Sequence, residues 1–483
     1  MDSKTEITLE KPESAPEIQP PAVDRYLVEG NLPIALWRFA IPFMFAYFLQ
    51  ALYGAVDLFI VGRYCNPAAI SAVATGSQLL MVLTGLIFGL AAGATALIGF
   101  NIGAKDDEGT ARALGSCASI FIIGAAVFTP LVMLSTNWFV SSLQTPTEAV
   151  EGTREYVFTI ACGLPFLIGY NVVGAIYRGL GDSMTPTIFI AVTCVANVFG
   201  DLFLVGYCGM GPLGAAIATD AALAISFIWS LVHMRKKRFP FDFHRTHFRL
   251  DKNSVRKILV VGVPLALQDG FTSFSFLIIV GIINSMGVMA SGGMGVADRV
   301  IGFMFLPDIA FMIAVTTAAA QNFGAKQPRR AFMSFVWGTT FAGLFGLLFW
   351  SLCQIWPTEI STLFTNNEEV ARQSGLYLRS FSLDCLCVAF IFNINGYFCG
   401  LGKSMIVFVH STITAFLARI PISYLISRGE DATLYDVGWA APLASCLSIM
   451  ICIGYFFWLR RGARKNALES GEEQEEATAP SGS

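Results

Sequence analysis

Twelve long apolar stretches restrict the fold of this chain more than any other feature of its sequence. They lie at residues 36–62, 68–99, 113–136, 157–178, 186–207, 212–234, 256–284, 294–320, 331–353, 377–399, 405–427 and 437–459. Each can cross the hydrocarbon core of a bilayer as a helix, which takes about 20 mostly apolar residues. Only 13% of the residues are charged, against about 25% in soluble domains. The sequence therefore predicts an all-α integral membrane protein with twelve transmembrane helices.

The chain also repeats itself at a nearly constant interval. The landmarks that recur in the same order are Pro42 and Pro264, NIGAK at 101–105 and NFGAK at 322–326, and GLGDSM at 179–184 and GLGKSM at 400–405. Such a repeat predicts two homologous halves, each with six of the apolar stretches. Each N-x-G-A-K motif follows the second stretch of its half, where a glycine and a lysine suit the end of a helix. We therefore interpret the motif as a turn of the fold.

The repeat divides the chain into five parts. Two six-helix bundles are expected at residues 33–238 and 255–465, joined by a cytoplasmic linker at 239–254. The terminal segments, 1–32 and 466–483, are acidic, and the composition of the second is of low complexity, which is typical of disordered tails. The first segment lacks the basic flank, apolar run and cleavage site of a signal peptide. We expect a disordered cytoplasmic tail at each end.

The distribution of basic residues predicts which side of the membrane each loop faces. Twenty lysines and arginines, Arg178 among them, follow the even-numbered stretches, whereas the opposite loops and their edges hold five: Arg63, Arg154, Arg372, Arg379 and Arg428. Basic residues accumulate in cytoplasmic loops, so both termini are predicted to be cytoplasmic. Two halves of six helices then share one orientation and form parallel repeats, as in some transporters.

Composition and spacing argue against several classes of function. The net charge of −3, without a concentrated basic face, argues against nucleic-acid binding. No cluster of histidine and cysteine has metal-ligand spacing, and neither a histidine cluster nor a soluble domain offers an active site, so we expect no metal, no cofactor and no enzyme. Cys65 and Cys208 lie near the external ends of apolar stretches, and whether they form a disulfide stays open.

Two aspartates within the apolar stretches of the first half are the leading candidates for a functional site. A charged side chain in the bilayer interior costs at least about 2.5–3.5 kcal/mol and usually faces a polar cavity. Asp57 and Asp201 lie about 8 Å and about 9 Å from the external ends of their helices, hence at one depth. Asn197 shares a helix face with Asp201. Two carboxylates and an amide at one depth suit a small cation or a shared proton; packing against stray hydroxyl or backbone groups is the structural alternative.

The second half carries a different set of charges. Arg419 follows Asn197 at the same interval at which Pro264 follows Pro42, so the matching place holds a cation instead of an amide. A buried arginine needs a carboxylate, and Asp269 or Asp308 at mid-helix is the expected partner. We interpret this charge network as structural, with a role in gating as the alternative.

Several short motifs, in their joint order, make the chain resemble the multidrug and toxic compound extrusion (MATE) family, and its bacterial members in particular. They are YGAVDLFIVG in the first stretch, YRGLGDSMTP after the fourth, ANVFGD in the fifth, and FNIGAK and QNFGAK after the second and eighth. The resemblance covers about residues 33–465. It implies a V-shaped pair of six-helix bundles around a central cavity, which exports organic, often cationic, compounds against an inward flow of Na⁺ or H⁺.

The resemblance also implies which residues hold the coupling ion. The family's cation site in the first bundle matches Asp57, Asn197, Asp201, Thr219 and, less closely, Asn171. One branch of the family keeps a glutamate in the seventh helix, where this chain has Thr272, so the resemblance does not extend to a second-bundle cation site of that kind.

The residue pattern and the resemblance together predict a secondary active antiporter. We expect it to export small organic compounds in exchange for H⁺ or Na⁺ by alternating access. The alternative within transport is a flippase for a lipid-linked or amphipathic precursor, which a cationic cavity open to lipid would favour. We expect a multi-pass monomer in the plasma (inner) membrane, surrounded by lipid, with a small molecule as its partner and the coupling ion in place of a cofactor.

Overall fold

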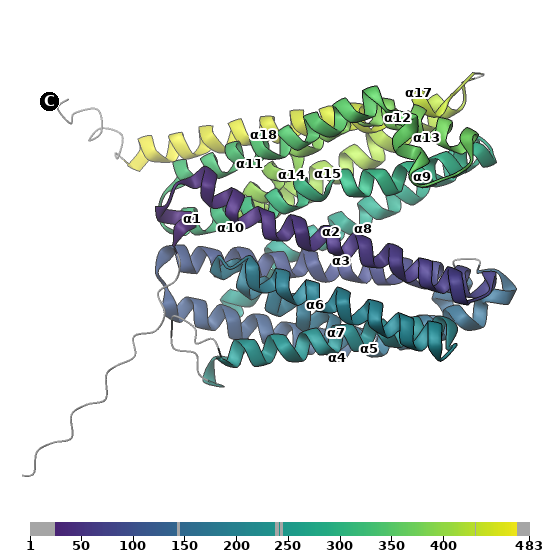
Figure 1. The fold of residues 1–483 in the computed structure, drawn as a ribbon. Helices are drawn as coiled ribbons and strands as arrows, with labels where there is room; N and C mark the ends of the chain where they lie inside the picture. The colour runs from purple at the N-terminus through teal and green to yellow at the C-terminus, as the bar shows by residue number, and fades with distance from the viewer. Residues whose placement is uncertain (1–24, 143–144, 237–240, 242–244, 430, 471–483) are drawn as a thin grey trace, which may run out of the picture.

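The computed structural model describes residues 25–142, 145–236, 241, 245–429 and 431–470. Within them, eleven helices are long and apolar enough to cross a membrane, and two shorter helices bent by 54° can form a twelfth span. The spans gather into two groups, α2–α7 and α8–α18 (Figure 1). They coincide with the twelve predicted stretches, so the prediction of an all-α membrane protein with two six-span halves is confirmed.

The first half begins with the short helix α1 (Tyr26–Glu29) and continues through six spans. These are α2 (Leu32–Tyr64), α3 (Pro67–Ala104), α4 (Asp107–Ser142), α5 (Val150–Leu180) after the 3-10 turn η1 (Thr147–Ala149), α6 (Met184–Asp201) with the π-helix η2 (Leu202–Tyr207), and α7 (Gly211–Lys236). The side chains of Asn31 and Asn66 each accept a hydrogen bond from the first turn of the helix that follows. Such caps satisfy N–H groups that have no partner within a helix.

The second half builds its six spans from more pieces. They are α8 (Lys252–Asn284); α9 (Val288–Met304) with α10 (Leu306–Gly324); α11 (Pro328–Ile355); α13 (Glu368–Phe381) with α14 (Asp384–Gly400); α15 (Ser404–Thr414), the π-helix η4 (Ala415–Arg419) and α16 (Ile420–Ser427); and α17 (Leu434–Gly438) with α18 (Ala440–Ser470). The short helix α12 (Pro357–Thr362) precedes α13, and the 3-10 turn η3 (Arg245–His247) precedes α8. Asp251 caps α8 by accepting the N–H of Ser254 at 2.8 Å.

Matching turns end matching helices in the two halves. Lys105 after α3 and Lys326 after α10 both adopt the left-handed conformation, with φ of 58° and 59°. The N–H of the residue after each lysine donates to the carbonyl of the motif's asparagine, at 3.0 Å in the first half and 2.9 Å in the second. This bond pattern is that of a Schellman turn. The prediction that N-x-G-A-K is a turn of the fold is therefore confirmed.

The first span of each half crosses to the other half. Residues 32–43 of α2 pack against α10 and α11 of the second half, whereas Ile60 near the end of α2 packs within the first. α8 does the reverse, because Ile258 belongs to the core of the first half and Ile279 to that of the second. The two prolines of the repeat lie inside these helices. Both α2 and α8 therefore connect the halves mechanically.

The backbones of the two halves touch at the end of the molecule that carries the N-x-G-A-K turns. A Cβ added at Gly103 of α3 would collide with the carbonyl oxygen of Gln321 in α10, and one added at Gly324 would collide with that of Phe100. Gly324 matches Gly103 in the repeat and Gln321 matches Phe100, so each half presents the same surface to the other. We refer to these four residues as the glycine seam.

The segment that includes α1 lies across the seam and contacts both halves. The Arg25 guanidinium and the Tyr26 hydroxyl donate to backbone carbonyls of the first half, each at 3.0 Å. The carbonyl of Leu27 accepts from the second half, from Asn322 at 3.1 Å and from Arg330 at 3.3 Å. These bonds correct the prediction of disorder for residues 25–32, because they hold that part of the segment in place.

The other boundary predictions have mixed outcomes. Residues 1–24 and 471–483, where disordered tails were expected, and part of the linker at 239–254 lie outside the described residues. α18 continues to Ser470, past the boundary expected at 465. Cys65 and Cys208 are free thiols, so the disulfide that the sequence left open is not formed in this structure.

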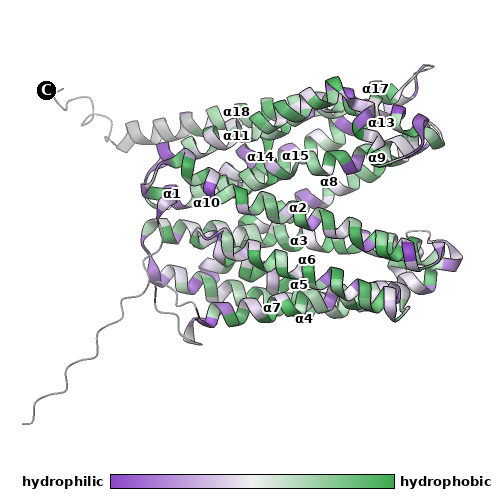
Figure 2. Ribbon diagram, viewed as in Figure 1, coloured by the Kyte–Doolittle hydropathy of each residue, from purple (hydrophilic) through white to green (hydrophobic). Residues whose placement is uncertain are grey.

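The outer surface of the spans is apolar. Figure 2 shows hydrophobic residues along the middle of the long helices and hydrophilic residues gathered toward their ends. Large apolar side chains are exposed in many spans, for example Leu134 of α4 and Met450 of α18. An apolar surface of this extent suits contact with lipid. The buried polar residues are therefore the ones that can indicate a functional site.

Candidate functional site

The structure brings Asp57 of α2 and Asp201 of α6 together. Their side chains are 8% and 0% exposed, and the carboxyl groups lie close enough to share a proton. In the described part of the chain, Oδ1 of Asp57 and both carboxyl oxygens of Asp201 have no hydrogen-bond partner. Two buried carboxylates in contact cannot both stay charged unless a proton or a cation lies between them. A pair of this kind has room in its chemistry for a proton or a cation.

Asn197 and Thr219 extend this site toward the centre of the molecule. The Asn197 amide donates to the Thr219 hydroxyl at 3.3 Å, and that hydroxyl donates to the carbonyl of Ala215 at 3.0 Å. Oδ1 of Asn197 has no partner among the described residues. Because Asn197 and Asp201 are one helical turn apart on α6, their side chains lie on one face. Acceptor oxygens without donors thus accumulate here, and oxygen is the ligand that hard cations prefer.

The backbone after Asp201 is irregular. α6 ends at this aspartate and the chain continues as the π-helix η2. π-type turns frequently accompany functional sites in helices, because they shift the register of the side chains that follow. The break therefore places the acid at the end of a regular helix, where the backbone can adjust to an ion.

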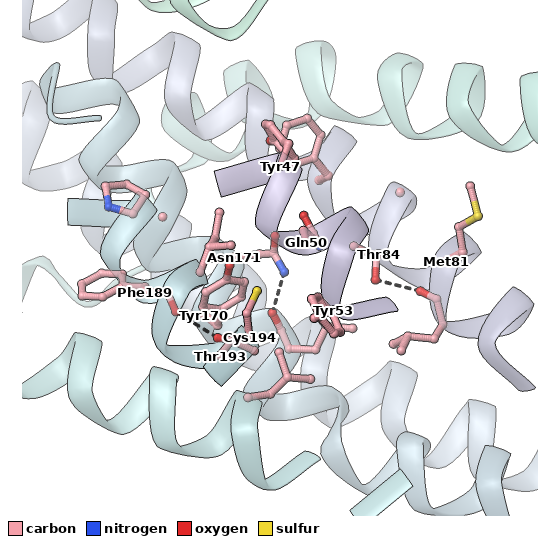
Figure 3. Close-up of a pocket in the computed structure, with 18 of the residues that line it drawn as sticks. Tyr47, Gln50, Tyr53, Met81, Thr84, Tyr170, Asn171, Phe189, Thr193 and Cys194 are labelled. Atoms are coloured by element: carbon pink, nitrogen blue, oxygen red, sulfur yellow. Dashed lines mark hydrogen bonds between the residues drawn. The ribbon is translucent and has the colours of Figure 1, made fainter. Parts of the chain in front are cut away.

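A cavity of about 420 Å³ lies next to Asn197 and Thr219, at the boundary of the two halves. Asn171 also faces this cavity, although its amide donates to the carbonyl of Leu167 in its own helix at 2.9 Å. Figure 3 shows the aromatic side chains that surround it, which include Tyr47, Tyr53, Tyr170 and Phe189. α8 and α10 of the second half contribute Asp269 and Met312. Asn197 and Thr219 line the cavity, whereas Asp57 and Asp201 do not.

The charge network expected in the second half is not formed. Within the described residues, Arg419 has no carboxylate within 4.0 Å; its guanidinium carbon lies 5.2 Å from the centre of the Phe276 ring. Asp384 lies near enough to Arg419 for an electrostatic interaction between the two side chains. Asp308 interacts in the same way with Asp384. Asp269 faces the cavity instead. The expected pairing with Asp269 or Asp308 is therefore corrected.

The positions of Asp308 and Asp384 give a physical reason for this correction. Asp308 lies in the first turn of α10 and Asp384 starts α14. The positive end of a helix dipole stabilises a carboxylate at such a place. The breaks before α10 and before α14 thus create helix N-termini that stabilise the two carboxylates, without a direct contact to an arginine.

Arg178 is a cavity residue that the sequence reading missed. It was counted among cytoplasmic loop residues, but it belongs to α5, is 6% exposed, and lines the cavity. Its guanidinium carbon lies 5.2 Å from the centre of the Phe88 ring. Leu167, Asn171, Gly174 and Arg178 all line the cavity, and their spacing of four, three and four residues puts them on one helix face. This spacing in the sequence is the pattern that could have placed Arg178 on the same helix face as Asn171.

Comparisons with known proteins agree with the repeat. The model of the family described as MatE matches residues 42–203 and again residues 264–425. A probable multidrug resistance protein of Bacillus subtilis, YoeA, is 24% identical over 440 residues, which cover 88% of this chain and 95% of the relative. The probable multidrug resistance protein NorM of Thermotoga maritima is 26% identical over 397 residues, covering 81% of this chain and 85% of the relative.

The fold is shared with solved structures. One of them is the outward-facing conformation of a multidrug resistance MATE family transporter of the MOP superfamily. It superimposes with a TM-score of 0.84 at 21% identity and covers 92% of this chain and 98% of its own. At this identity the likeness concerns the fold alone.

Proposed function

The chain belongs to the MATE family, whose model matches both of its halves, and from this premise we propose that it exports small organic, often cationic, compounds in exchange for H⁺ or Na⁺. It is a multi-pass membrane transporter and not an enzyme. The names of its relatives support multidrug efflux as the physiological role. We further propose that it works as a monomer in lipid of the plasma membrane.

The contact between Asp57 and Asp201 carries the proposal of ion coupling. A buried pair of carboxyl groups without donors gains a favourable state when a proton or a sodium ion binds. Asn197 and Thr219 offer further oxygen atoms beside the Asp57–Asp201 pair, and Asn171 offers one from the cavity side. The driving ion would therefore bind in the first half, beside the cavity but outside it.

The course of α2 supports a way to transmit this event. Asp57 lies in the part of α2 that packs within the first half, whereas residues 32–43 of the same helix pack against the second half. A change in how α2 contacts α6 when the ion binds would therefore shift one half relative to the other. Such a differential interaction with two states is what a ligand needs to move a conformational equilibrium.

The proposed orientation follows the basic residues. Helix α1 and the C-terminal end of α18 lie at the same end of the molecule (Figure 1), and the charge asymmetry supports a cytoplasmic location for that end. The glycine seam lies there too, so access from the cytoplasm would require the two halves to separate at the seam. No observation favours the flippase alternative, because the cavity has one arginine opposite one aspartate instead of a cationic lining.

The experiment that tests the function uses purified protein in lipid vesicles. Dansylcadaverine, a fluorescent organic cation, is followed while a sodium gradient and a pH gradient are imposed separately. We expect accumulation against its own gradient under one of the two, and none in vesicles without protein. If neither gradient drives uphill movement while downhill movement occurs, antiport is contradicted.

A further inference from the structure

Two charged side chains face the cavity from opposite halves. Arg178 of α5 and Asp269 of α8 both line the 420 Å³ cavity, and both also line an adjoining space of about 70 Å³. Together they make one continuous region with a cation on the side of the first half and an acid on the side of the second. Neither residue belongs to the ion site formed by Asp57 and Asp201.

Neither charge has an oppositely charged partner among the described residues. Nη2 of Arg178 is buried and has no acceptor, and no described carboxylate lies within 4.0 Å of this guanidinium. The amide of Gln268, next to Asp269 in sequence, donates to Thr272 at 3.4 Å and not to the acid. Leaving a buried charge unpaired is costly. The cavity is lined by the buried Arg178 and the partly buried Asp269, so it suits a ligand that carries both opposite charges.

Both charged residues pack against helix α3. The Cβ of Asp269 is 3.8 Å from where a Cβ on Gly85 would stand, and the guanidinium of Arg178 lies over Phe88. Gly85 and Phe88 are three residues apart on one face of α3, which separates them by about 4.5 Å along the helix axis. Asp269 and Arg178 thus approach α3 at neighbouring positions of one helix face, beside Gly85 and Phe88.

The remaining lining fits an apolar body. Aromatic rings from Tyr47, Tyr53, Tyr170 and Phe189 surround the cavity (Figure 3), and Met312 adds a polarisable side chain from the second half. A volume of about 420 Å³ lies within the range of sites for small molecules, about 300–1,000 Å³. The space can therefore hold an aromatic group beyond the two charged ends.

We propose that the cavity binds zwitterions, with a substrate carboxylate on Arg178 and a substrate ammonium on Asp269. The planar guanidinium offers paired N–H donors to a carboxylate, which is the strongest geometry available to arginine. Because Arg178 lies on α5 and Asp269 on the crossing helix α8, a bound zwitterion forms a charged contact with both helices, and a compound with one charge does so with only one of them. This inference rests on the proposed export function and names its substrate class.

Three dansyl compounds separate the contributions of the two charges. Nε-dansyl-lysine is a zwitterion, dansylcadaverine is the same molecule without the carboxylate, and 6-(dansylamino)hexanoic acid is the same molecule without the amine. Binding to purified protein is measured by dansyl fluorescence, without any gradient. We expect the wild type to bind dansyl-lysine at least about tenfold more tightly than either analogue, since a hydrogen bond to a charged group contributes about that much.

Variants assign each preference to one residue. Arg178→Gln is expected to lose the preference over dansylcadaverine and to keep that over the hexanoic acid, and Asp269→Asn to do the opposite. Arg178→Lys keeps the positive charge and is expected to retain part of the preference, which guards against a variant that fails to fold. Arg154→Gln, exposed on the same helix, and Asp298→Asn, exposed on α9, are the matched controls.

The outcomes distinguish this inference from the proposed function. If the wild type binds the three compounds equally, or if both cavity variants keep its preferences, the zwitterion site is overturned even when dansylcadaverine is exported. If the preferences follow the two residues but no gradient drives uphill efflux, the site stands and the antiport proposal fails.

Discussion

The two halves share a backbone plan but differ at the positions where the first half holds its acids. Asp57, Asn197 and Asp201 form the buried acceptor cluster, and the repeat places Ile279, Arg419 and Ser423 at the matching positions of the second half. The second half thus lacks both acids and has a permanent cation where the first has an amide. At this place only the first half has the carboxyl groups that a proton or a small cation would need. We infer that one half senses the ion and that the other moves relative to it.

In the second half, a buried histidine has hydrogen-bond partners for both of its ring nitrogens within the same half. His410 is fully buried, with Nε2 2.8 Å from Oδ1 of Asn395 and Nδ1 2.7 Å from the hydroxyl of Ser448. These residues come from α15, α14 and α18, so one side chain joins three helices. The repeat sets where a polar residue can lie, whereas the residue types around it decide whether an external ion is needed.

Removing either acid of the first half is expected to have the largest effect. Asp57→Asn and Asp201→Asn keep the side-chain size but remove the charge that the ion requires, so uphill efflux of dansylcadaverine should fall to the level of protein-free vesicles, while downhill efflux continues. The double variant should be no worse than the singles, because both residues serve one ion. Asp107→Asn, exposed at the start of α4, is the control. Uphill efflux at the wild-type rate by the double variant would remove ion coupling from this half.

Removing the cation of the second half is expected to affect stability more than coupling. Arg419→Ala removes the positive charge that acts on Asp384 without touching it, so the cost should be smaller than the about 3–5 kcal/mol lost when a direct buried pair is broken. Asn197→Ala, the matching change in the first half, should cost only about 1 kcal/mol. Melting temperatures of the purified variants measure both. Adding Asp384→Asn to Arg419→Ala should recover part of the loss, and recovery by Asp269→Asn instead would restore the partner expected from sequence.

Substitutions in the glycine seam test whether the two halves contact each other through equivalent surfaces. Gly103→Ala and Gly324→Ala each place a methyl group against a backbone carbonyl of the other half, which costs about 1–3 kcal/mol by overpacking. Because the two contacts are equivalent, both variants should lower the melting temperature by similar amounts and weaken contact between the halves. Gly343→Ala in α11 is the control, since a Cβ there meets nothing within 4 Å. If one seam glycine tolerates alanine and the other does not, the contact is not symmetric.

Features that depend on local sequence were predictable. The spans follow from apolar length alone, and the N-x-G-A-K turns follow from a glycine and a lysine at a helix end. The depth of Asp57 and Asp201 within their helices was enough to expect them together, because each depth is counted from a helix end at about 1.5 Å per residue. The structure places the two carboxyl groups together, and ion binding by the pair stays a prediction.

Features that depend on the rotation of a helix about its axis, or on the angle at which helices cross, could not be predicted from the sequence. Arg419 and Asp269 lie at comparable depths, but Asp269 faces the cavity and Arg419 faces Phe276. Hydropathy alone does not show where α5 ends, because Gly179 and Gly181 follow Arg178 and can either continue a helix or end it. Arg178 therefore looked like a loop residue. The crossing of α2 and α8 between the halves depends on packing between residues far apart in sequence, which hydropathy does not report.

The smallest expected effect concerns the caps that start the two crossing helices. α2 begins with the neutral Asn31, whose Oδ1 accepts an N–H at 3.5 Å, whereas α8 begins with Asp251, which accepts one at 2.8 Å. Hydrogen bonds from Ser254 lower the pKa of Asp251 below its usual range. The charged form therefore contributes stability at neutral pH, and that contribution is lost as the pH falls through the lowered pKa. Asn31 has no such dependence, because an amide does not titrate.

Exchanging the two cap residues turns this difference into a test. At pH 7, Asp251→Asn should destabilise by at most about 0.3–1 kcal/mol, the value of a carboxylate at an exposed helix N-terminus, and Asn31→Asp should stabilise by a similar amount. Melting temperatures relative to the wild type should shift by only about 1–2 °C for a chain of this size. Both differences should shrink as the pH is lowered below about 4, where carboxyl groups become protonated. If the Asp251→Asn difference persists at low pH, the cap acts through its geometry alone, and α2 and α8 would start in the same way despite their different residues.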